Sequence, residues 1–307
     1  MHQSTLPRRR DVSRAAASVL LYAVGMLARA TTLALSSHPG PTLAVTLLSA
    51  VLGVAVGMTP LRVFALALAI AAGQLSIGLS NDWIDADRDT AVGRTDKPVA
   101  QGLVTVATVR TAAFASLTVS LLVSFALGLA AGTAHLVFIA SAWAYNAGLK
   151  RTVFSVVPFV VSFGLLPTIV TLALPDPATA APWAIAVGAV FGVSIHFTNV
   201  LPDLVDDART GIAGLPHRLG RVTAGVVAFV ALAVAAVLVV VGARLDTAGG
   251  PSAVVAVVGL VASLSIAGWG TVLVVTRPPS RLLFRLVVVA SLLIAVQLGL
   301  GGTRLVA

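Results

Sequence analysis

The chain has 307 residues, of which 58% are hydrophobic and only 10% are charged, and its mean hydropathy is +1.02. A soluble domain carries about 25% charged residues, so this composition excludes an ordinary soluble protein and indicates a membrane protein. The chain has no cysteine, which excludes disulfides and thiolate metal sites and leaves oxygen and imidazole as metal ligands.

Apolar segments of about 20 residues recur along the chain, and each is long enough to cross a hydrocarbon core about 30 Å thick. Only helices satisfy their own backbone groups in lipid without closing a barrel. The predicted fold is therefore all-α, a polytopic membrane bundle of nine transmembrane helices. It forms one domain over residues 1–307, because no polar segment is long enough to fold separately. The predicted helices cover residues 42–58, 61–80, 104–130, 133–149, 152–174, 182–201, 222–242, 252–276 and 281–303.

Residues 1–41 precede the first predicted span, and we expect them to form a cytoplasmic or interfacial segment. The stretch 15–36 is apolar, but Arg29 interrupts it and the sequence from His38 to Pro41 ends it. It therefore lies along the interface or leads into the first span.

The basic residues predict the orientation of the bundle. With the N-terminus inside, only Arg62, Arg244 and Arg304 of the 20 Lys and Arg residues fall outside, and the other 17 face the cytoplasm. We therefore expect a multi-pass protein whose N-terminus is cytoplasmic and whose C-terminus is outside. The net charge of +9 follows from this topology, so we expect no nucleic-acid partner, and no protein partner is inferred.

Eight of the 11 acidic residues, all aspartates, lie in two short windows that both fall at cytoplasmic helix ends. The first acidic window follows the second predicted helix, and the second follows the sixth. The first window contains Asp82, Asp85, Asp87, Asp89 and Asp96, and the second contains Asp203, Asp206 and Asp207.

The spacing within each window places carboxylates on one helical face. Asp82, Asp85 and Asp89 are separated by three and four residues, and Asp203 and Asp207 by four. Like charges on one face repel, so a cation is expected between them. Hard oxygen ligands suit Mg²⁺ bridging to a substrate phosphate, and the predicted ligands are Asp85, Asp89, Asp203 and Asp207. Asp87, Asp96 and Asp206 are expected to be peripheral.

Basic residues accompany both acidic windows and are candidates for neutralising a phosphate group. The positive-inside rule explains each of them equally well, so both interpretations stay open. Lys150 is the strongest candidate because it is one of only two lysines. The candidates are Arg88, Arg94, Lys97, Lys150, Arg151, Arg209 and Arg218.

With these motifs the sequence resembles the UbiA superfamily of intramembrane prenyltransferases. Asn81, Asp82, Asp85 and Asp89 match its first signature, and the stretch DLVDDARTGIAGLP from Asp203 to Pro216 matches the second. The sequence YNAGLKR, from Tyr145 to Arg151, is similar to the end of the family's fourth helix. The resemblance covers nearly the whole chain and agrees with nine helices.

The resemblance implies magnesium-dependent transfer of a prenyl group from a polyprenyl diphosphate to a small acceptor, aromatic or a quinone precursor, in the bilayer. It implies that the five aspartates of the two faces and Lys150 act in catalysis. The implied donor-binding residues are Asn81, Arg88, Arg94, Lys97, Tyr145 and Arg209. Trp83 and Phe197 are candidate aromatic faces for the prenyl cation, and His196 and Asn199 are candidate acceptor contacts.

Three alternatives stay open from the sequence. Within the same superfamily, the protein would transfer a phosphoribosyl group to a polyprenyl phosphate or cyclise a prenyl chain without an acceptor. From another class, an ion-coupled transporter also uses intramembrane acids. The acids of this chain cluster at helix ends and not in the middle of the bilayer, which favours the enzyme.

Overall fold

The computed structural model describes residues 32–33, 36–245, 250–278 and 280–307. These residues form helices and connecting turns, with no β-strand among them and one isolated β-bridge between Ala180 and Val306. The all-α prediction is therefore confirmed. Most of the expected interfacial segment 15–36 lies outside the described residues.

Nine long helices of the described chain occupy the places of the nine predicted ones. Proline begins several of them, because its missing N–H lies where a helix has no acceptor to offer. The helices are α2 (Pro39–Ala55), α3 (Pro60–Ile84), α5 (Val106–Leu127), α6 (Leu129–Ala147), α7 (Val157–Leu172), α8 (Pro182–Val200), α11 (Arg221–Gly242), α12 (Gly250–Thr276) and α13 (Arg281–Gly301).

Among the described residues, seven helices are long and apolar enough to cross a membrane. The helix α2 has 17 residues and is shorter than these seven, and α6, which contains His135 and Asn146, is not one of them. Short helices connect the long ones at one end of the bundle. They are α4 (Ala86–Ala91), η1 (Leu149–Arg151), η2 (Val153–Val156), η3 (Leu201–Asp203), α9 (Leu204–Arg209) and α10 (Leu215–Leu219).

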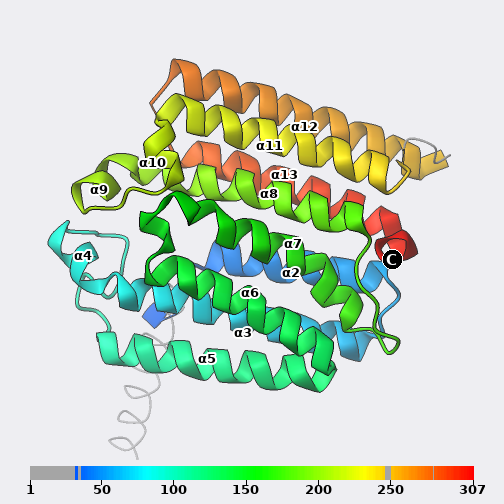
Figure 1. Cartoon of the computed structure of the whole chain (residues 1–307), viewed down its shortest axis with the longest axis horizontal. Helices are drawn as coiled ribbons and strands as arrows, with labels where there is room; N and C mark the ends of the chain where they lie inside the picture. Colours follow the sequence, from blue (N-terminus) through cyan, green and yellow to red (C-terminus); the bar gives the residue numbers. More distant parts are fainter. Residues whose placement is uncertain (1–31, 34–35, 246–249, 279) are drawn as a thin grey trace, which may run out of the picture.

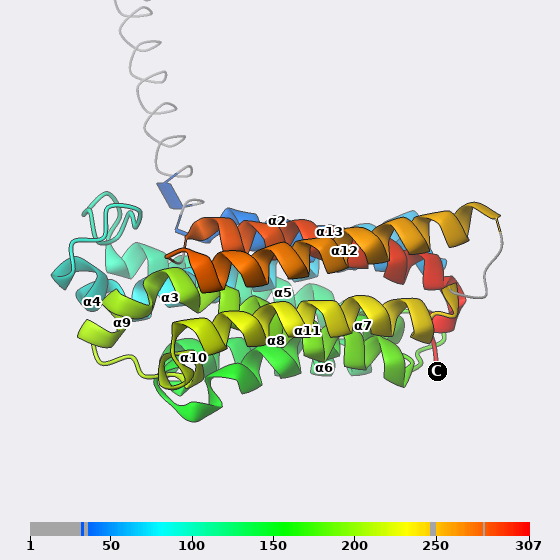
Figure 2. The same cartoon turned by 90° about the horizontal axis from the view of Figure 1, so that it is seen from above.

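The long helices pack as a closed ring. Each packs on the next one along the chain, from α2 to α13, and α13 packs back on α2. Figures 1 and 2 show that α4, α9 and α10 lie at one end of this bundle and the C-terminus at the other. The space-filling view shows consecutive segments as consecutive bands across one face, from α5 to α12. The ring encloses a space between α2, α3, α6, α7, α8 and α13, and this space holds the cavity described below.

Glycines let α7 and α8 approach closely. A Cβ atom on Gly188 would lie 2.1 Å from the carbonyl oxygen of Phe163, and one on Gly192 would lie 2.4 Å from that of Phe159. Pro167 within α7 has no N–H, so it cannot donate to the carbonyl of Phe163. The close packing of α8 fixes the backbone that carries Phe159 and Phe163.

Arginines hold the end of the bundle opposite α4 and α9. The guanidinium of Arg62 donates to the carbonyls of Leu127 and Ala173, and that of Arg304 donates to the carbonyl of Ala243 at 2.6 Å. These carbonyls lie at the C-terminal ends of α5, α7 and α11, where the helix leaves them without partners. All three arginines predicted to lie outside therefore share the end away from both acidic windows, since Arg244 directly follows Ala243.

Candidate functional site

The two acidic windows meet at one end of the bundle. The first window runs from the last turn of α3 through α4, and the second runs through η3 and α9. Arg88 Nη1 lies 3.8 Å from Asp207 Oδ1, and Arg94 Nη1 lies 3.6 Å from Asp203 Oδ2. Two guanidinium groups of the first window therefore contact the carboxylates of the second, and the two windows face each other as predicted.

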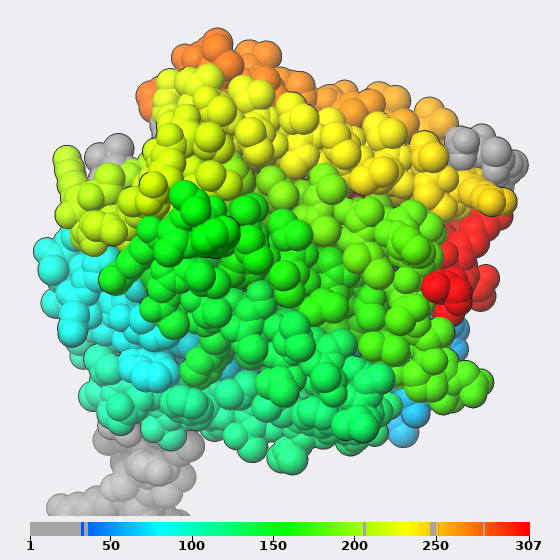
Figure 3. Space-filling model, in the orientation of Figure 1, coloured from blue at the N-terminus to red at the C-terminus, as the bar shows by residue number. Residues whose placement is uncertain are grey.

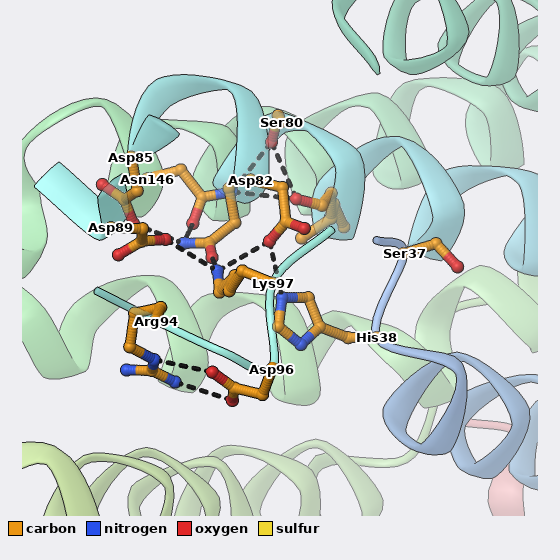
Figure 4. Close-up of polar contacts among 12 residues, drawn as sticks. Ser37, His38, Ser80, Asp82, Asp85, Asp89, Arg94, Asp96, Lys97 and Asn146 are labelled. Carbon is orange, nitrogen blue, oxygen red and sulfur yellow. Dashed lines mark hydrogen bonds and ion pairs between the residues drawn. The ribbon is translucent and has the colours of Figure 1, made fainter. Parts of the chain in front are cut away.

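Three carboxylates of the first window are buried. Asp82 is 1% exposed, and Asp85 and Asp89 are each 2% exposed. A buried carboxylate is stable only when it is paired or hydrogen-bonded. Lys150, itself 5% exposed, donates to both oxygens of Asp85 at 2.5 and 2.6 Å. Lys97 donates to Asp82 Oδ1 at 2.6 Å, as Figure 4 shows.

Arg88 bridges the carboxylates further. Its Nη2 donates to Asp85 Oδ2 at 3.1 Å and to Asp89 Oδ1 at 3.0 Å, in addition to the contact of its Nη1 with Asp207. Arg94 pairs twice with Asp96, at 2.8 and 3.0 Å. The five aspartates predicted to act in catalysis therefore face four basic side chains, those of Arg88, Arg94, Lys97 and Lys150. These aspartates are Asp82, Asp85, Asp89, Asp203 and Asp207.

The pKa values of the groups at the helix ends follow from these contacts. Burial lowers the pKa of Lys150, although the carboxylate of Asp85 acts in the opposite direction. The hydrogen bonds from Arg94 hold the pKa of Asp96 well below its usual value, and Asp96 in turn raises the pKa of Arg94. Arg281 also donates to Asp96 at 2.9 Å, so Asp96, which we expected to be peripheral, ties the start of α13 to the first window.

The side-chain amide of Asn81 connects the carboxylates to α6 and to Lys97. Its Nδ2 donates to Asp85 Oδ2 at 3.1 Å and to Asn146 Oδ1 at 3.3 Å, and its Oδ1 accepts from Lys97 at 2.9 Å. Asn146 donates to Ser80 Oγ at 2.8 Å and to the carbonyl of Ile77 at 3.0 Å. Sequence reasoning missed Asn146, although it directly follows Tyr145 in the stretch YNAGLKR.

Two histidines also contact the aspartates and were not predicted to do so. His38 Nε2 lies 3.3 Å from Asp82 Oδ1, and His217 Nε2 lies 3.5 Å from Asp207 Oδ2. His217 directly follows Pro216, the last residue of the second signature, which was the available signal. For His38 the sequence offered no signal, because its contact depends on the path of the chain before α2.

A cavity of about 250 Å³ begins beside the carboxylates and extends into the bundle between α2, α3, α6, α7, α8 and α13. Its polar end includes Asn81 and Asn146, and Tyr145 and Asn199 also line it. Deeper in the bundle the wall is mostly apolar. The aromatic side chains there are those of Phe138, Phe159, Phe163 and Phe191.

Two further predicted residues, Tyr145 and His196, lie against each other. Tyr145 presents its ring edge-on to Phe159 and to His196, with centroid distances of 5.1 and 5.7 Å. His196 lies behind this tyrosine, and its Nε2 is 3.1 Å from the hydroxyl of Ser155. Its role in this structure is to connect α8 to η2.

Four other predicted residues lie away from the cavity wall. Phe197 is buried, and Trp83 packs against Phe114 on α5. Arg209 is exposed at the end of α9, and Asp87 is exposed on α4, as expected for a peripheral acid. The side chain of Asp206 lies outside the described part of the structure.

The carboxylates fit a divalent cation by their chemistry. Asp89 Oδ2 is buried and accepts no hydrogen bond, and its described neighbour is the Lys97 ammonium at 3.3 Å. Buried oxygen donors of this kind suit Mg²⁺. Among the described residues, however, no group of three or more His, Cys, Asp or Glu side chains is arranged to hold a metal ion. Arg88 and Lys150 neutralise the carboxylates instead.

Several solved structures share this fold. A UbiA homologue from Archaeoglobus fulgidus bound to GPP and Mg²⁺ is 15% identical, with a TM-score of 0.67 and coverage of 89% of this chain and 99% of that one. A UbiA homologue from Aeropyrum pernix K1 is 17% identical, with a TM-score of 0.66 and coverage of 85% and 96%. A structure described for digeranylgeranylglyceryl phosphate synthase in membranes is 11% identical, with a TM-score of 0.65 and coverage of 90% and 99%. A sequence comparison with curated proteins finds no match.

The fold is shared with these UbiA homologues. The model of the UbiA prenyltransferase family matches residues 42–289. This protein therefore belongs to the UbiA prenyltransferase family. It is a membrane enzyme, and the transporter alternative is set aside.

Proposed function

We propose that this protein transfers a polyprenyl group from a prenyl diphosphate to a small aromatic or quinone-precursor acceptor within the membrane, releasing diphosphate. The observation that carries the proposal is that two facing acidic windows, paired with Lys and Arg, lie beside the polar end of a mostly apolar cavity, where Asn81 and Asn146 form the wall. The similar protein from Archaeoglobus fulgidus was solved with GPP and Mg²⁺, which supports the same ligands for this chain.

Asp85, Asp89, Asp203 and Asp207 are the residues that would hold magnesium. Magnesium bound there supplies a Lewis acid that stabilises negative charge on the departing diphosphate oxygens. Asp82 acts through its neighbours, because its carboxylate holds the ammonium of Lys97, and Lys97 in turn donates to Asn81.

The basic side chains neutralise the leaving group. In this structure Lys150 and Arg88 both donate hydrogen bonds to Asp85. When Asp85 binds a metal ion instead, these two cations become available to phosphate oxygens. Arg offers paired donors and Lys a compact charge for this purpose. Arg94, Lys97 and Arg209 are further candidates for the same role, and Asn81 would donate from its amide.

The cavity protects the prenyl unit from water. As the bond between the allylic carbon and the diphosphate oxygen breaks, its electron pair leaves with the oxygen and positive charge develops on the prenyl unit. The acceptor then supplies the electron pair of the new bond and loses a proton. The ring of Tyr145 lines the cavity next to Asn146 and offers an aromatic face to this charge.

We further propose that all nine long helices span the bilayer, with the N-terminus and both acidic windows in the cytoplasm and the C-terminus outside. The chain has no cysteine, so single-cysteine variants test this without background. Asp87→Cys, at the acidic end, should react with a membrane-impermeant thiol reagent only from the cytoplasmic side. Asp176→Cys, in the exposed loop after α7, should react only from the outside, and the reverse pattern would refute this orientation.

The proposed function is tested with purified protein, magnesium, a labelled prenyl diphosphate and a panel of acceptors, with products analysed by mass spectrometry. Asp85→Ala and Asp203→Ala should each lower turnover about a thousandfold or more, because each removes a ligand that stabilises the leaving group. Asp87→Ala is the matched control, because Asp87 belongs to the same window but is exposed. Wild-type turnover by folded Asp85→Ala protein would refute the proposed site.

The products also separate the alternatives within the family. A prenylated acceptor with free diphosphate supports the proposed reaction. A cyclic hydrocarbon formed without an acceptor indicates cyclisation, and a phosphoribosylated lipid indicates phosphoribosyl transfer.

A further inference from the structure

The chain just before α2 brings a histidine to the polar end of the cavity. His38 directly precedes Pro39, the first residue of α2, and it lines the cavity together with Asn81 and Asn146. Its Nε2 lies 3.3 Å from Asp82 Oδ1, and Figure 4 shows the imidazole ring directed at this carboxylate. His38 therefore contacts the first acidic window and also belongs to the wall of the cavity.

The position of His38 is fixed by the packing of its neighbour on α3. A Cβ atom on Gly78 would overlap the carbonyl oxygen of Ser37, so the backbone before α2 crosses α3 in direct contact. Asp82 lies four residues after Gly78, about one helical turn further along the same face of α3. Ser37 is 2% exposed, and its carbonyl accepts a hydrogen bond from the Thr42 hydroxyl at 3.2 Å. The backbone next to His38 is thus held by both α2 and α3.

The backbone of His38 has an uncommon conformation. Its φ of 54° and ψ of 67° lie in the left-handed region, which residues other than glycine seldom adopt and which is restricted further before a proline. Such conformations persist only where the surrounding structure holds them, and they concentrate at functional sites. In His38 this conformation accompanies a ring that contacts Asp82.

Transfer of a prenyl group to an acceptor releases a proton, and few groups of the cavity can take it. Of the described residues that line the cavity, His38 is the one with a basic side chain, and Tyr145 is the one other whose side chain ionises. The buried aspartates beside the cavity are already paired with lysine and arginine side chains. Imidazole is the side-chain base best suited to proton uptake near neutral pH.

Asp82 gives the imidazole the orientation that a base needs. A neutral imidazole that faces a carboxylate carries its proton on the nitrogen next to it, here Nε2, and this leaves the lone pair of Nδ1 to accept a proton. Lys97 also donates to Asp82 Oδ1 at 2.6 Å, so the carboxylate is held in place from a second side. The side chain of His38 is 45% exposed, and within the described part of the chain its polar contact is the one to Asp82.

We propose that His38, oriented by Asp82, is the general base that takes the proton of the acceptor. This inference rests on the proposed function and assigns its deprotonation step. As the carbon–oxygen bond of the donor breaks, its electron pair leaves with the diphosphate, and the acceptor forms the new bond to the allylic carbon. The proton that the acceptor loses moves to Nδ1 of His38. The imidazolium is then paired with Asp82, and its exposed side releases the proton to water.

The test uses the purified full-length protein with magnesium, GPP as the donor and phenols of graded acidity as acceptors. His38→Gln should lower kcat about a hundredfold or more for phenols that are neutral at the pH of the assay. For a phenol that is already ionised the loss should be less than about threefold, because no base is then needed. Gly40→Ala is the matched control, since its Cβ atom would have nothing within 4 Å, and it should keep the wild-type rate.

Two further measurements separate a base from a structural role. The dissociation constant of GPP with magnesium should differ by less than about threefold between His38→Gln and the wild-type protein, because a base acts on the acceptor and not on the donor. Imidazole added to His38→Ala should raise turnover at least about tenfold and should leave the wild-type protein and Gly40→Ala unchanged. A structural role would instead weaken the binding of GPP, and added imidazole would not restore turnover.

The proposal is overturned if folded His38→Gln turns over neutral phenols within about threefold of the wild-type rate. An equal loss for neutral and ionised phenols would overturn it as well, and so would a His38→Ala protein that does not respond to imidazole. Failure of the proposed function is distinguishable, because the wild-type protein itself would then transfer no prenyl group to any phenol.

Discussion

The ion pair between Lys150 and Asp85 links the end of α6 to the end of α3, and its removal has a calculable effect. Lys150 follows α6, Asp85 follows α3, and both side chains are almost fully buried. The Lys150 ammonium contacts both carboxylate oxygens at 2.5 and 2.6 Å. We consider the single variants Lys150→Met and Asp85→Asn and the double variant that combines them.

The size of the effect depends on which partners remain. Removing one member of a buried pair costs about 3–5 kcal/mol in the free energy of unfolding when the other charge is left alone. After Lys150→Met, Asp85 keeps its hydrogen bonds from Arg88 and Asn81, so we expect a cost of about 2–3 kcal/mol. Asp85→Asn leaves the buried ammonium with only an amide oxygen, and we expect about 3–5 kcal/mol.

The double variant isolates the interaction. Neither charge then remains buried and unpaired, so the double variant should be more stable than the sum of the two single effects by about 2–3 kcal/mol. Unfolding of the three variants and the wild-type protein in detergent measures this coupling. Arg151→Met is the control, because the neighbouring Arg151 is exposed, and it should change stability by less than about 0.5 kcal/mol. A coupling below about 0.5 kcal/mol would show that the pair does not hold the ends of α3 and α6 together and would refute this reasoning.

Three further outcomes are expected. Gly78→Ala should lower the free energy of unfolding by about 1–3 kcal/mol, because a Cβ atom there would lie 2.3 Å from the Ser37 carbonyl oxygen. The control in thermal unfolding is Gly40→Ala, whose added Cβ would have nothing within 4 Å. Equal unfolding midpoints for the two variants would contradict the close contact at Gly78. Asp96→Asn should cost no more than about 1 kcal/mol at pH 7, since the ion pairs are partly exposed. The pKa of Asp96 in the folded protein lies below the unfolded value of about 3.9, so its ion pairs contribute their full stabilisation above that pH and lose it as the pH falls. The free energies of unfolding of the wild type and of Asp96→Asn should therefore become equal in acid. A constant difference between them down to about pH 2 would refute the assignment. Thorough chelation of divalent metal should abolish prenyl transfer and added magnesium should restore it, whereas turnover that survives chelation would refute the metal role.

The sequence alone predicted the membrane class, the places of the helices and the aspartates of the candidate site. Hydropathy fixes where helices form, because any apolar segment of about 20 residues must satisfy its backbone internally in lipid. The spacing of Asp82, Asp85 and Asp89 determined a shared face, because helical periodicity depends on local geometry alone.

Only the tertiary structure decided which groups neutralise these acids and which side chains line the cavity. Asn146 and Lys150 reach the aspartates of α3 from the end of α6, and His38 reaches Asp82 from the chain before α2. Phe163 and Phe191 line the cavity where glycines bring α7 against α8, and a phenylalanine in an apolar helix has the same sequence signature whether it faces lipid or a cavity. Contacts between helices depend on which faces meet, and in lipid the apolar faces of a helix do not differ enough for one sequence to reveal this.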